Sequence, residues 1–129
     1  MTSSMKTPLG RVKGLGSAKD GTSTWWMQRT TAVALIPLGV WLVISVILVA
    51  KDGYPAIMGY LQHPFYNFLL ISWIVISAFH GQLGLQVIVE DYVHHRGSRI
   101  ACLLAIKGLA LGLAGWCIFC LLILQFKTF

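Results

Sequence analysis

The sequence predicts an all-α integral membrane protein with three transmembrane helices. Of its 129 residues, 57% are hydrophobic and only 11% are charged, and the mean hydropathy is +0.75. A soluble domain of this length would need a far more charged surface. The apolar residues stand in long uncharged blocks and not at amphipathic spacing. Since about 20 mostly apolar residues cross the hydrocarbon core of a bilayer, each block is long enough for one span.

The three blocks place the three predicted helices. The first block, Thr30 to Ala50, predicts a helix over about 30–50. The second has no Asp, Glu, Lys or Arg from Gly53 to Val89. It is longer than one span and carries Gly-Tyr-Pro and His-Pro early, so its helix is expected to begin near Pro64 and to cover about 65–90. The third block predicts a helix over about 100–125.

Two regions follow from this division: a cytoplasmic or interfacial amino-terminal segment, 1–29, and a three-helix transmembrane domain, 30–129. The segment is rich in Gly, Ser, Thr and Lys, and its glycines disfavour a stable amphipathic helix. A cleaved signal peptide is not expected, because its apolar part usually spans 7–15 residues and this block has about 20.

Positive charges predict the orientation, since cytoplasmic loops are enriched in Lys and Arg. Most Lys and Arg residues lie in the amino-terminal segment and around the second loop, whereas the first loop and the carboxyl terminus have only Lys51 and Lys127. The amino terminus and the second loop are therefore expected in the cytoplasm. The net charge of +6 flanks membrane spans and forms no stripe for nucleic acid. The predicted cytoplasmic charges are Lys6, Arg11, Lys13, Lys19, Arg29, Arg96, Arg99 and Lys107.

Three cysteines, Cys102, Cys117 and Cys120, all fall in the third predicted helix. Cys117 and Cys120 form a C-x-x-C pair, but no second pair and no histidine stands beside it. A metal site needs such neighbours, so packing is the favoured role of these thiols.

Small residues predict a close-approach face on two of the helices. Gly108, Gly112 and Gly115 lie in the third helix, and Gly81 and Gly84 lie in the second. Small side chains let the backbones of membrane helices touch. Two interpretations are open: contact between helices of this chain, which the sequence favours, or room for a flat prosthetic group.

His80 lies a few residues on the cytoplasmic side of the centre of the second predicted helix. Ionisable side chains at that depth are costly and usually face the bundle interior with a partner. Either the neutral imidazole hydrogen-bonds to a neighbouring helix, or it ligates a metal or a haem iron. The other histidines, His63, His94 and His95, lie near helix ends, so a second axial ligand would come from another chain.

The same helix ends on two acids and a tyrosine. Glu90 and Asp91 stand at its carboxyl end, where the helix dipole disfavours negative charge, so a requirement other than helix stability is expected. Asp91 follows His80 by 11 residues, which leaves an angular offset of about 20° and an axial rise of about 16 Å. Tyr92 sits at interface depth, where belt tyrosines are common. Together with residues 94–96, this set predicts redox or proton chemistry at the cytoplasmic edge.

A three-helix chain with H-x-x-x-G in its second helix, followed by D-Y, resembles the smaller hydrophobic membrane-anchor subunit of succinate dehydrogenase, respiratory complex II. The motif reads His80-Gly-Gln-Leu-Gly84 and then Asp91-Tyr92-Val93. The run Arg29-Thr-Thr-Ala-Val-Ala is also similar to that family's entry to the first helix. Residues 14–21, with the Trp-Trp-Met-Gln-Arg beyond them, resemble the alphaproteobacterial type. The third helix is similar only in length and hydropathy.

The resemblance implies roles for four residues. His80 would be one axial ligand of haem b, while Tyr92 would hydrogen-bond a carbonyl of ubiquinone with Asp91 beside it. Arg29 falls where the family has an arginine near the haem propionates. A charge that snorkels at the interface, next to neighbouring tryptophans, is an equally good interpretation of Arg29.

Three further polar residues near the end of the helix, Glu90, His94 and His95, match nothing in the family. The amino terminus is also longer than in shorter members of the family, and what it docks on is open.

The resemblance also implies partners: a larger cytochrome b anchor subunit that supplies the other haem ligand, an iron–sulfur subunit and a flavoprotein subunit. Ubiquinone would be the substrate. FAD and iron–sulfur clusters would belong to the partners, because this chain has no cluster motif. A haem with two histidine ligands carries electrons and does not activate oxygen. The chain is therefore expected to be one subunit of an enzyme in a bacterial inner membrane, and no enzyme alone.

Other interpretations stay open. The chain could be the anchor of a quinol:fumarate reductase, or a haem-free anchor, against which His80 argues. It could be a small proton-coupled transporter subunit in which His80 and Asp91 form a relay. Inverted repeats or broken helices with paired acids would indicate a transporter, and the sequence contains neither. It could also be a purely structural anchor.

Overall fold

A computed structural model describes residue 9 and residues 19–126. Over residues 19–126 the chain forms four helices: α2 (Lys19–Ala50), α3 (Gly53–Gln62), α4 (Pro64–Tyr92) and α5 (Arg96–Phe126). Three of them, α2, α4 and α5, are long and apolar enough to cross a membrane. The predicted all-helical class with three candidate spans is confirmed.

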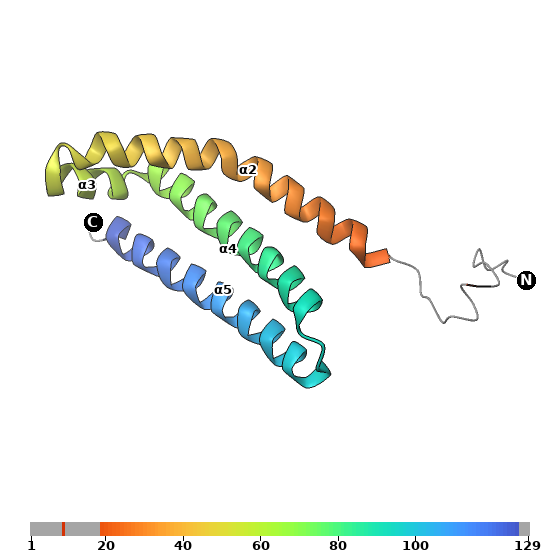
Figure 1. Cartoon of the computed structure of the whole chain (residues 1–129). Coiled ribbons are helices and arrows are strands. Elements are labelled where there is room, and N and C mark those ends of the chain that lie inside the picture. Colours follow the sequence, from red (N-terminus) through yellow and green to blue (C-terminus); the bar gives the residue numbers. More distant parts are fainter. Residues whose placement is uncertain (1–8, 10–18, 127–129) are drawn as a thin grey trace, which may run out of the picture.

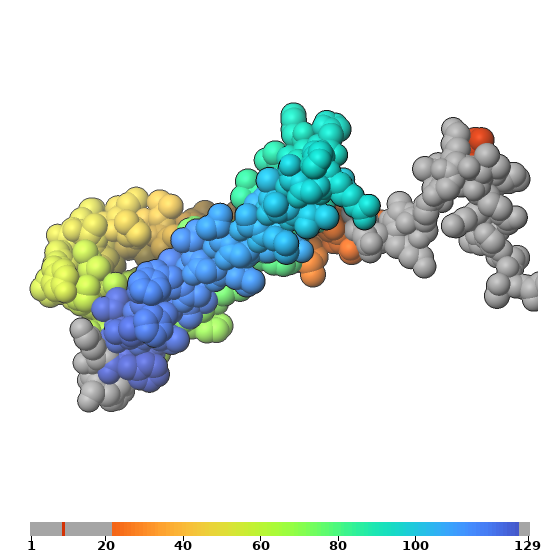
Figure 2. Space-filling view, turned by 90° about the horizontal axis from the view of Figure 1, so that it is seen from below, coloured from red at the N-terminus to blue at the C-terminus, as the bar shows by residue number. Residues whose placement is uncertain are grey.

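The three long helices form an open layer with α4 in the middle (Figure 1). α4 packs against both neighbours, whereas α2 and α5 make no contact with each other within the described residues. Figure 2 shows α5 along the near side of this layer when it is viewed from below. In the described part of the chain only Asn67 and Leu83 are buried. The chain thus has almost no core of its own, and its apolar faces must meet lipid or other chains.

The first long helix starts earlier than predicted. α2 begins at Lys19 and runs through the predicted boundary at residue 30 without a break. The hydroxyls of Thr30 and Thr31 donate to the carbonyls of Trp26 and Met27, each at 2.8 Å, which satisfies these polar groups inside the helix. The rest of the predicted amino-terminal segment, 1–18 apart from Leu9, lies outside the described residues, as does Lys127.

α2 also continues through a proline. Pro37 lies inside the helix, where its ring nitrogen cannot donate to the carbonyl four residues earlier. Figure 1 shows α2 arching along its length over the other helices.

The connection between α2 and α4 contains a helix that was not predicted. Gly53 has a φ of 78°, a left-handed conformation that glycine adopts without steric cost. The chain reverses there into α3, whose ten residues are too few to cross a bilayer. Pro64 then opens α4, as predicted, at a position where the missing proline N–H is not needed.

Polar and aromatic side chains fix the end of the layer that carries α3. Asn67 is only 1% exposed. Its Nδ2 donates to the carbonyls of Leu61 in α3, at 3.0 Å, and of Leu121 in α5, at 3.2 Å. The rings of Tyr60 and Tyr66 stack with their centroids 4.3 Å apart. Hydrogen bonds and ring stacking from this chain alone therefore join α3, α4 and α5 at this end.

The opposite end of the layer holds the start of α2 and the α4–α5 connection (Figure 1). Arg29, Arg96 and Arg99 belong to this end, while Lys51 belongs to the α3 end. This distribution agrees with the positive-inside pattern. The side of the membrane on which each end lies stays a prediction.

Candidate functional site

His80 sits near the middle of α4, since residue 78 is the midpoint of Pro64–Tyr92. Its side chain is half-buried, and its Nδ1 lies 2.9 Å from the hydroxyl oxygen of Thr31 in α2. One of the two interpretations of His80, a hydrogen bond to a neighbouring helix, is therefore confirmed. The bond uses one ring nitrogen and leaves Nε2 without a hydrogen-bond partner among the described residues, so the same histidine can still act as a ligand.

The other histidines lie away from His80 and have local surroundings of their own. His63 stands between α3 and α4 and contacts the ring of Tyr66, with centroids 4.8 Å apart. The backbone N–H of Ser98 points to Nδ1 of His95 at 3.5 Å, close to the first turn of α5. His94 is exposed in the connection between α4 and α5. Of the residues described, no group of three or more His, Cys, Asp or Glu could hold a metal ion.

The glycines near His80 face open space. A Cβ added at Gly81 or Gly84 would meet no atom within 4 Å, and the same is true of Gly108, Gly112 and Gly115 in α5. The interpretation favoured from the sequence, close approach between helices of this chain, is therefore wrong for these positions. Because Gly84 is one helical turn beyond His80 on the same face, the space above it adjoins the histidine.

Asp91 and Tyr92 occupy the last turn of α4. Both are exposed, Tyr92 to 79%, and within the described residues neither has a hydrogen-bond partner. α4 is unbroken from His80 to Asp91, so the two side chains start from one face, about 16 Å apart along the axis. Glu90 accepts a hydrogen bond from Nε2 of Gln86 at 2.9 Å, which gives it a partner within the helix.

Arg29 is exposed and its guanidinium lies over the ring of Trp25, 5.6 Å from the ring centroid. This cation–π contact matches the interfacial interpretation of Arg29. Thr31, which contacts His80, is two residues further along α2. Two residues turn a helix by about 200°, so Arg29 starts from the opposite face of α2. A contact with haem propionates stays a prediction for this residue.

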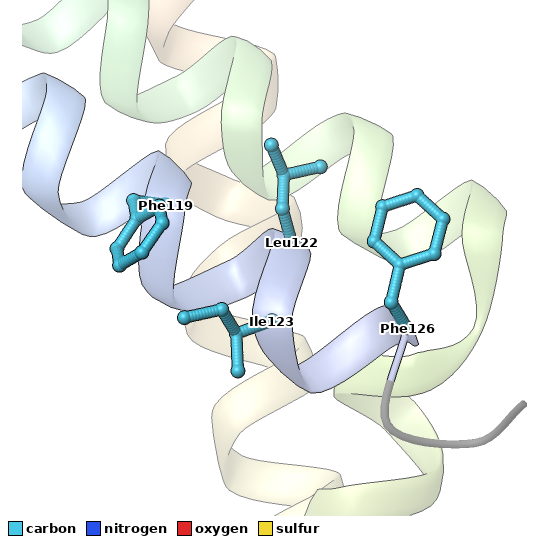
Figure 3. Close-up of a pocket in the computed structure, with 4 residues that line it drawn as sticks. All are labelled: Phe119, Leu122, Ile123 and Phe126. Atoms are coloured by element: carbon cyan, nitrogen blue, oxygen red, sulfur yellow. The ribbon is translucent and has the colours of Figure 1, made fainter.

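The cavities at the surface of α5 contain little that could do chemistry. A recess of about 450 Å³ at the end of this helix is lined by Phe119, Leu122, Ile123 and Phe126, and Figure 3 shows that all four side chains are apolar. A groove of about 480 Å³ between α4 and α5 has Ser77 and Gln82 as its polar residues and includes Cys117. All three cysteines are free thiols.

Sequence reasoning missed two polar residues that the fold brings into use. Thr31 contacts His80 across two helices, and Asn67 joins three helices. Both contacts depend on how the helices are set against each other, which no local pattern reports. The only signal was that each is a polar residue within an otherwise apolar block.

Comparison with known proteins points to one family. The family model for the succinate dehydrogenase/fumarate reductase transmembrane subunit matches residues 3–119. A succinate dehydrogenase hydrophobic membrane anchor subunit from Rickettsia bellii is 30% identical over 83% of this chain and 86% of its own length.

Other relatives carry similar names. The succinate dehydrogenase membrane anchor subunit of Reclinomonas americana is 33% identical over 72% of this chain and 80% of its own length. The hydrophobic membrane anchor subunit from Paracoccus denitrificans is 28% identical over 67% of each chain. No solved structure gives a significant match. The three spans, the histidine in the middle helix and these similarities lead to one conclusion: the chain belongs to the family of succinate dehydrogenase/fumarate reductase transmembrane subunits.

Proposed function

We propose that this chain is the membrane-anchor subunit of a succinate:ubiquinone oxidoreductase and attaches its flavin and iron–sulfur subunits to the membrane. The observation that carries the proposal is the arrangement of α4. This helix holds His80 near its middle, hydrogen-bonded to α2, and ends on Asp91 and Tyr92 with exposed side chains. The names of the relatives favour succinate oxidation over the fumarate reductase direction.

The chain is a multi-pass protein of the bacterial inner membrane, as its family and its three spans indicate. Membership of this family argues against the transporter interpretation. The relatives are named as anchor subunits, so the chain is one part of a larger enzyme and no catalyst alone.

The residues around His80 fit a haem b shared with a second anchor subunit. A porphyrin supplies four ligands to its iron, so this chain needs to provide only one axial imidazole. Nε2 of His80 has no hydrogen-bond partner among the described residues, and a Cβ added at Gly84, on the same face, would meet no atom within 4 Å. The absence of a three-residue metal cluster among the described residues fits a haem better than a bare ion. When bound, the haem would supply a one-electron carrier.

Tyr92 and Asp91 are proposed to line the ubiquinone site. Reduction of a quinone consumes two electrons and two protons. The phenol of Tyr92 can donate a hydrogen bond to one carbonyl, which polarises it, and the carboxyl group of Asp91 can relay protons from water at the membrane surface. Both side chains are exposed on this chain. The remaining walls of the site are therefore assigned to the partner subunits.

The open layer supports the proposed partners. α4 packs against α2 and α5 on two sides and against α3 at one end, and large apolar side chains on α2 and α5 are exposed along their whole length. A larger cytochrome b anchor subunit that packs on this layer would bury such side chains and bring the second histidine to the iron. The iron–sulfur subunit would dock at the end that carries Tyr92, where electrons reach the quinone over a short distance.

The test is a reduced-minus-oxidised visible spectrum of membrane complexes purified through a tag on this chain, with the co-purifying subunits identified by mass spectrometry. A sharp band of a low-spin b-type haem, together with a flavoprotein and an iron–sulfur protein, is expected. A chain that purifies alone, without haem and without soluble partners, would contradict the proposal.

A further inference from the structure

Thr31 is the residue through which α2 reaches His80. The two side chains meet across the α2–α4 contact, with the Thr31 hydroxyl oxygen 2.9 Å from Nδ1 of His80. Both residues are half-buried, so this bond lies away from the exposed ends of the helices. The direction of the bond decides which ring nitrogen of His80 carries the proton.

The distances around the Thr31 hydroxyl favour donation of its proton within α2. A threonine hydroxyl has one proton, while a carbonyl oxygen can only accept. The hydroxyl oxygen of Thr31 lies 2.8 Å from the carbonyl oxygen of Met27 and 3.1 Å from that of Gln28. The hydroxyl therefore donates within α2 and accepts at its remaining contact. The donor in that contact is the N–H at Nδ1 of His80.

We infer that Thr31 is a positioning residue that fixes the tautomer and ring orientation of His80 so that the lone pair of Nε2 is presented to the haem iron. This inference rests on the proposed function, in which His80 is an axial ligand. A metal-bound imidazole usually donates its other N–H to a fixed acceptor, which orients the ring and raises its basicity. The hydroxyl of Thr31 supplies that acceptor from a neighbouring helix.

No other described residue takes this role. His80 has no second hydrogen-bond partner within residues 19–126, and the glycines on its own helix offer no side chain. Arg29, the nearest cation of α2 in sequence, lies over Trp25 and starts from the opposite face of the helix. Loss of the Thr31 hydroxyl would leave the Nδ1–H of His80 without an acceptor, and the ring free to turn or to change tautomer.

The neighbouring threonine provides a matched control. Thr30 makes the same bond within α2, from its hydroxyl to the carbonyl of Trp26 at 2.8 Å, but it is exposed and the hydrogen bond to His80 is made by Thr31. Thr31→Val removes the hydroxyl and keeps the side-chain shape, while Thr31→Ser keeps the hydroxyl. Thr31→Ala removes the hydroxyl without adding volume and stands in if the valine variant does not assemble. Thr30→Val repeats the valine change without touching the histidine.

The experiment measures two properties of the intact oxidised complex: the electron paramagnetic resonance signal of the low-spin haem and the rate of haem transfer to apomyoglobin. Thr31→Val is expected to shift the signal and to speed haem loss roughly 10- to 100-fold, the usual effect of removing the partner of a metal ligand. Thr31→Ser and Thr30→Val are expected to match the unmodified complex.

Two results would overturn the inference: equal behaviour of Thr31→Val and Thr30→Val in both measurements, or a serine variant as impaired as the valine variant. His80→Ala in the same assays separates this inference from the proposed function. If His80→Ala retains haem with an unchanged signal, the proposed haem ligation by His80 fails, and with it the premise of this inference. If His80→Ala loses haem while Thr31→Val behaves normally, only the role of Thr31 fails.

Discussion

The polar residues at the two ends of α4 differ in burial and in hydrogen bonding. At the amino end, Asn67 is 1% exposed and donates to carbonyls of α3 and α5. At the carboxyl end, Asp91 and Tyr92 are exposed and have no hydrogen-bond partner in the described part of the chain. At the amino end the NH2 group of Asn67 bonds within this chain, and at the carboxyl end the polar side chains are open to another molecule.

This difference distinguishes polar side chains that hold the helices together from polar side chains that are available to a substrate. Buried polar groups are costly in lipid unless they are hydrogen-bonded. The side-chain NH2 group of Asn67 meets that requirement by joining helices, whereas its Oδ1 is buried and has no hydrogen-bond partner among the described residues. Exposed groups at an interface carry no such cost and remain available to a substrate. His80 lies between the two cases, because one ring nitrogen is bonded to Thr31 and the other is free. Substitutions at the two ends should therefore change different properties of the complex.

The largest effect is expected from Tyr92→Phe. Loss of the phenol removes a hydrogen bond to the reacting quinone carbonyl, and the rate of succinate-dependent ubiquinone reduction should fall about 100-fold. Since the side chain is exposed in this chain, the melting temperature of the complex should not change. Succinate oxidation by a soluble artificial acceptor is the control and should survive. Equal loss of both activities would assign Tyr92 to assembly instead.

Asn67→Ala should act on stability and leave the quinone chemistry intact. The change removes two hydrogen bonds and leaves a cavity, while loss of the buried, unpartnered Oδ1 offsets part of this cost. The net cost should be about 2 kcal/mol and should appear as a lower melting temperature of the purified complex. Ser72→Ala is the matched control, because the Ser72 hydroxyl bonds only the carbonyl of Phe68 within its own helix at 2.8 Å. A variant of Asn67 that melts normally would show that this amide does not hold the helices together.

Asp91→Asn should slow ubiquinone reduction about tenfold without loss of the complex. The effect is placed below the usual range for an acid–base group, because water at the exposed carboxyl end can take over part of the proton transfer. The measurement is the steady-state rate in complexes with equal flavin content. Failure of this variant to assemble would contradict a role in proton delivery.

Tyr60→Phe should have the smallest effect, and its effect on stability should be opposite in sign to that of Asn67→Ala. The hydroxyl of Tyr60 is buried without a hydrogen-bond partner, so its removal should leave stability unchanged or raise it by up to about 1 kcal/mol. The ring stacking on Tyr66 is retained. The same chemical change thus tests both ends of the layer: at Tyr60 it should spare the quinone rate, and at Tyr92 it should spare the stability. A clear loss of stability in Tyr60→Phe would indicate a partner for this hydroxyl in the assembled complex.

The sequence predicted the spans better than the contacts between them. Uncharged blocks and the early prolines were enough to place three helices and the start of α4 at Pro64, because the bilayer sets the length of a span. α3 was missed because its ten residues stand between glycine and proline and read as a loop. The start of α2 was placed too late, since polar threonines can extend a helix by bonding their own backbone.

In the candidate site, too, features within one helix could be predicted from the sequence, and contacts between helices could not. The spacing of His80 and Asp91 follows from helical geometry alone, and the unbroken α4 retains it. The hydrogen bond between His80 and Thr31 joins residues that are 49 positions apart in sequence, and it depends on the relative register of α2 and α4, which no local pattern encodes. The open space at the glycines of α4 and α5 was unpredictable for the same reason, because a small residue permits close approach but does not require it.

The most direct test of the proposed function is the haem-to-flavin ratio of purified complexes that carry His80→Ala or His94→Ala. His80 is the half-buried histidine at mid-helix, and His94 is an exposed histidine at the end of the same segment. The predicted result is a haem content near zero, or a shifted haem spectrum, for His80→Ala and a normal content for His94→Ala. Full haem occupancy with an unchanged spectrum in the His80→Ala complex would contradict the assignment of His80 as an axial ligand.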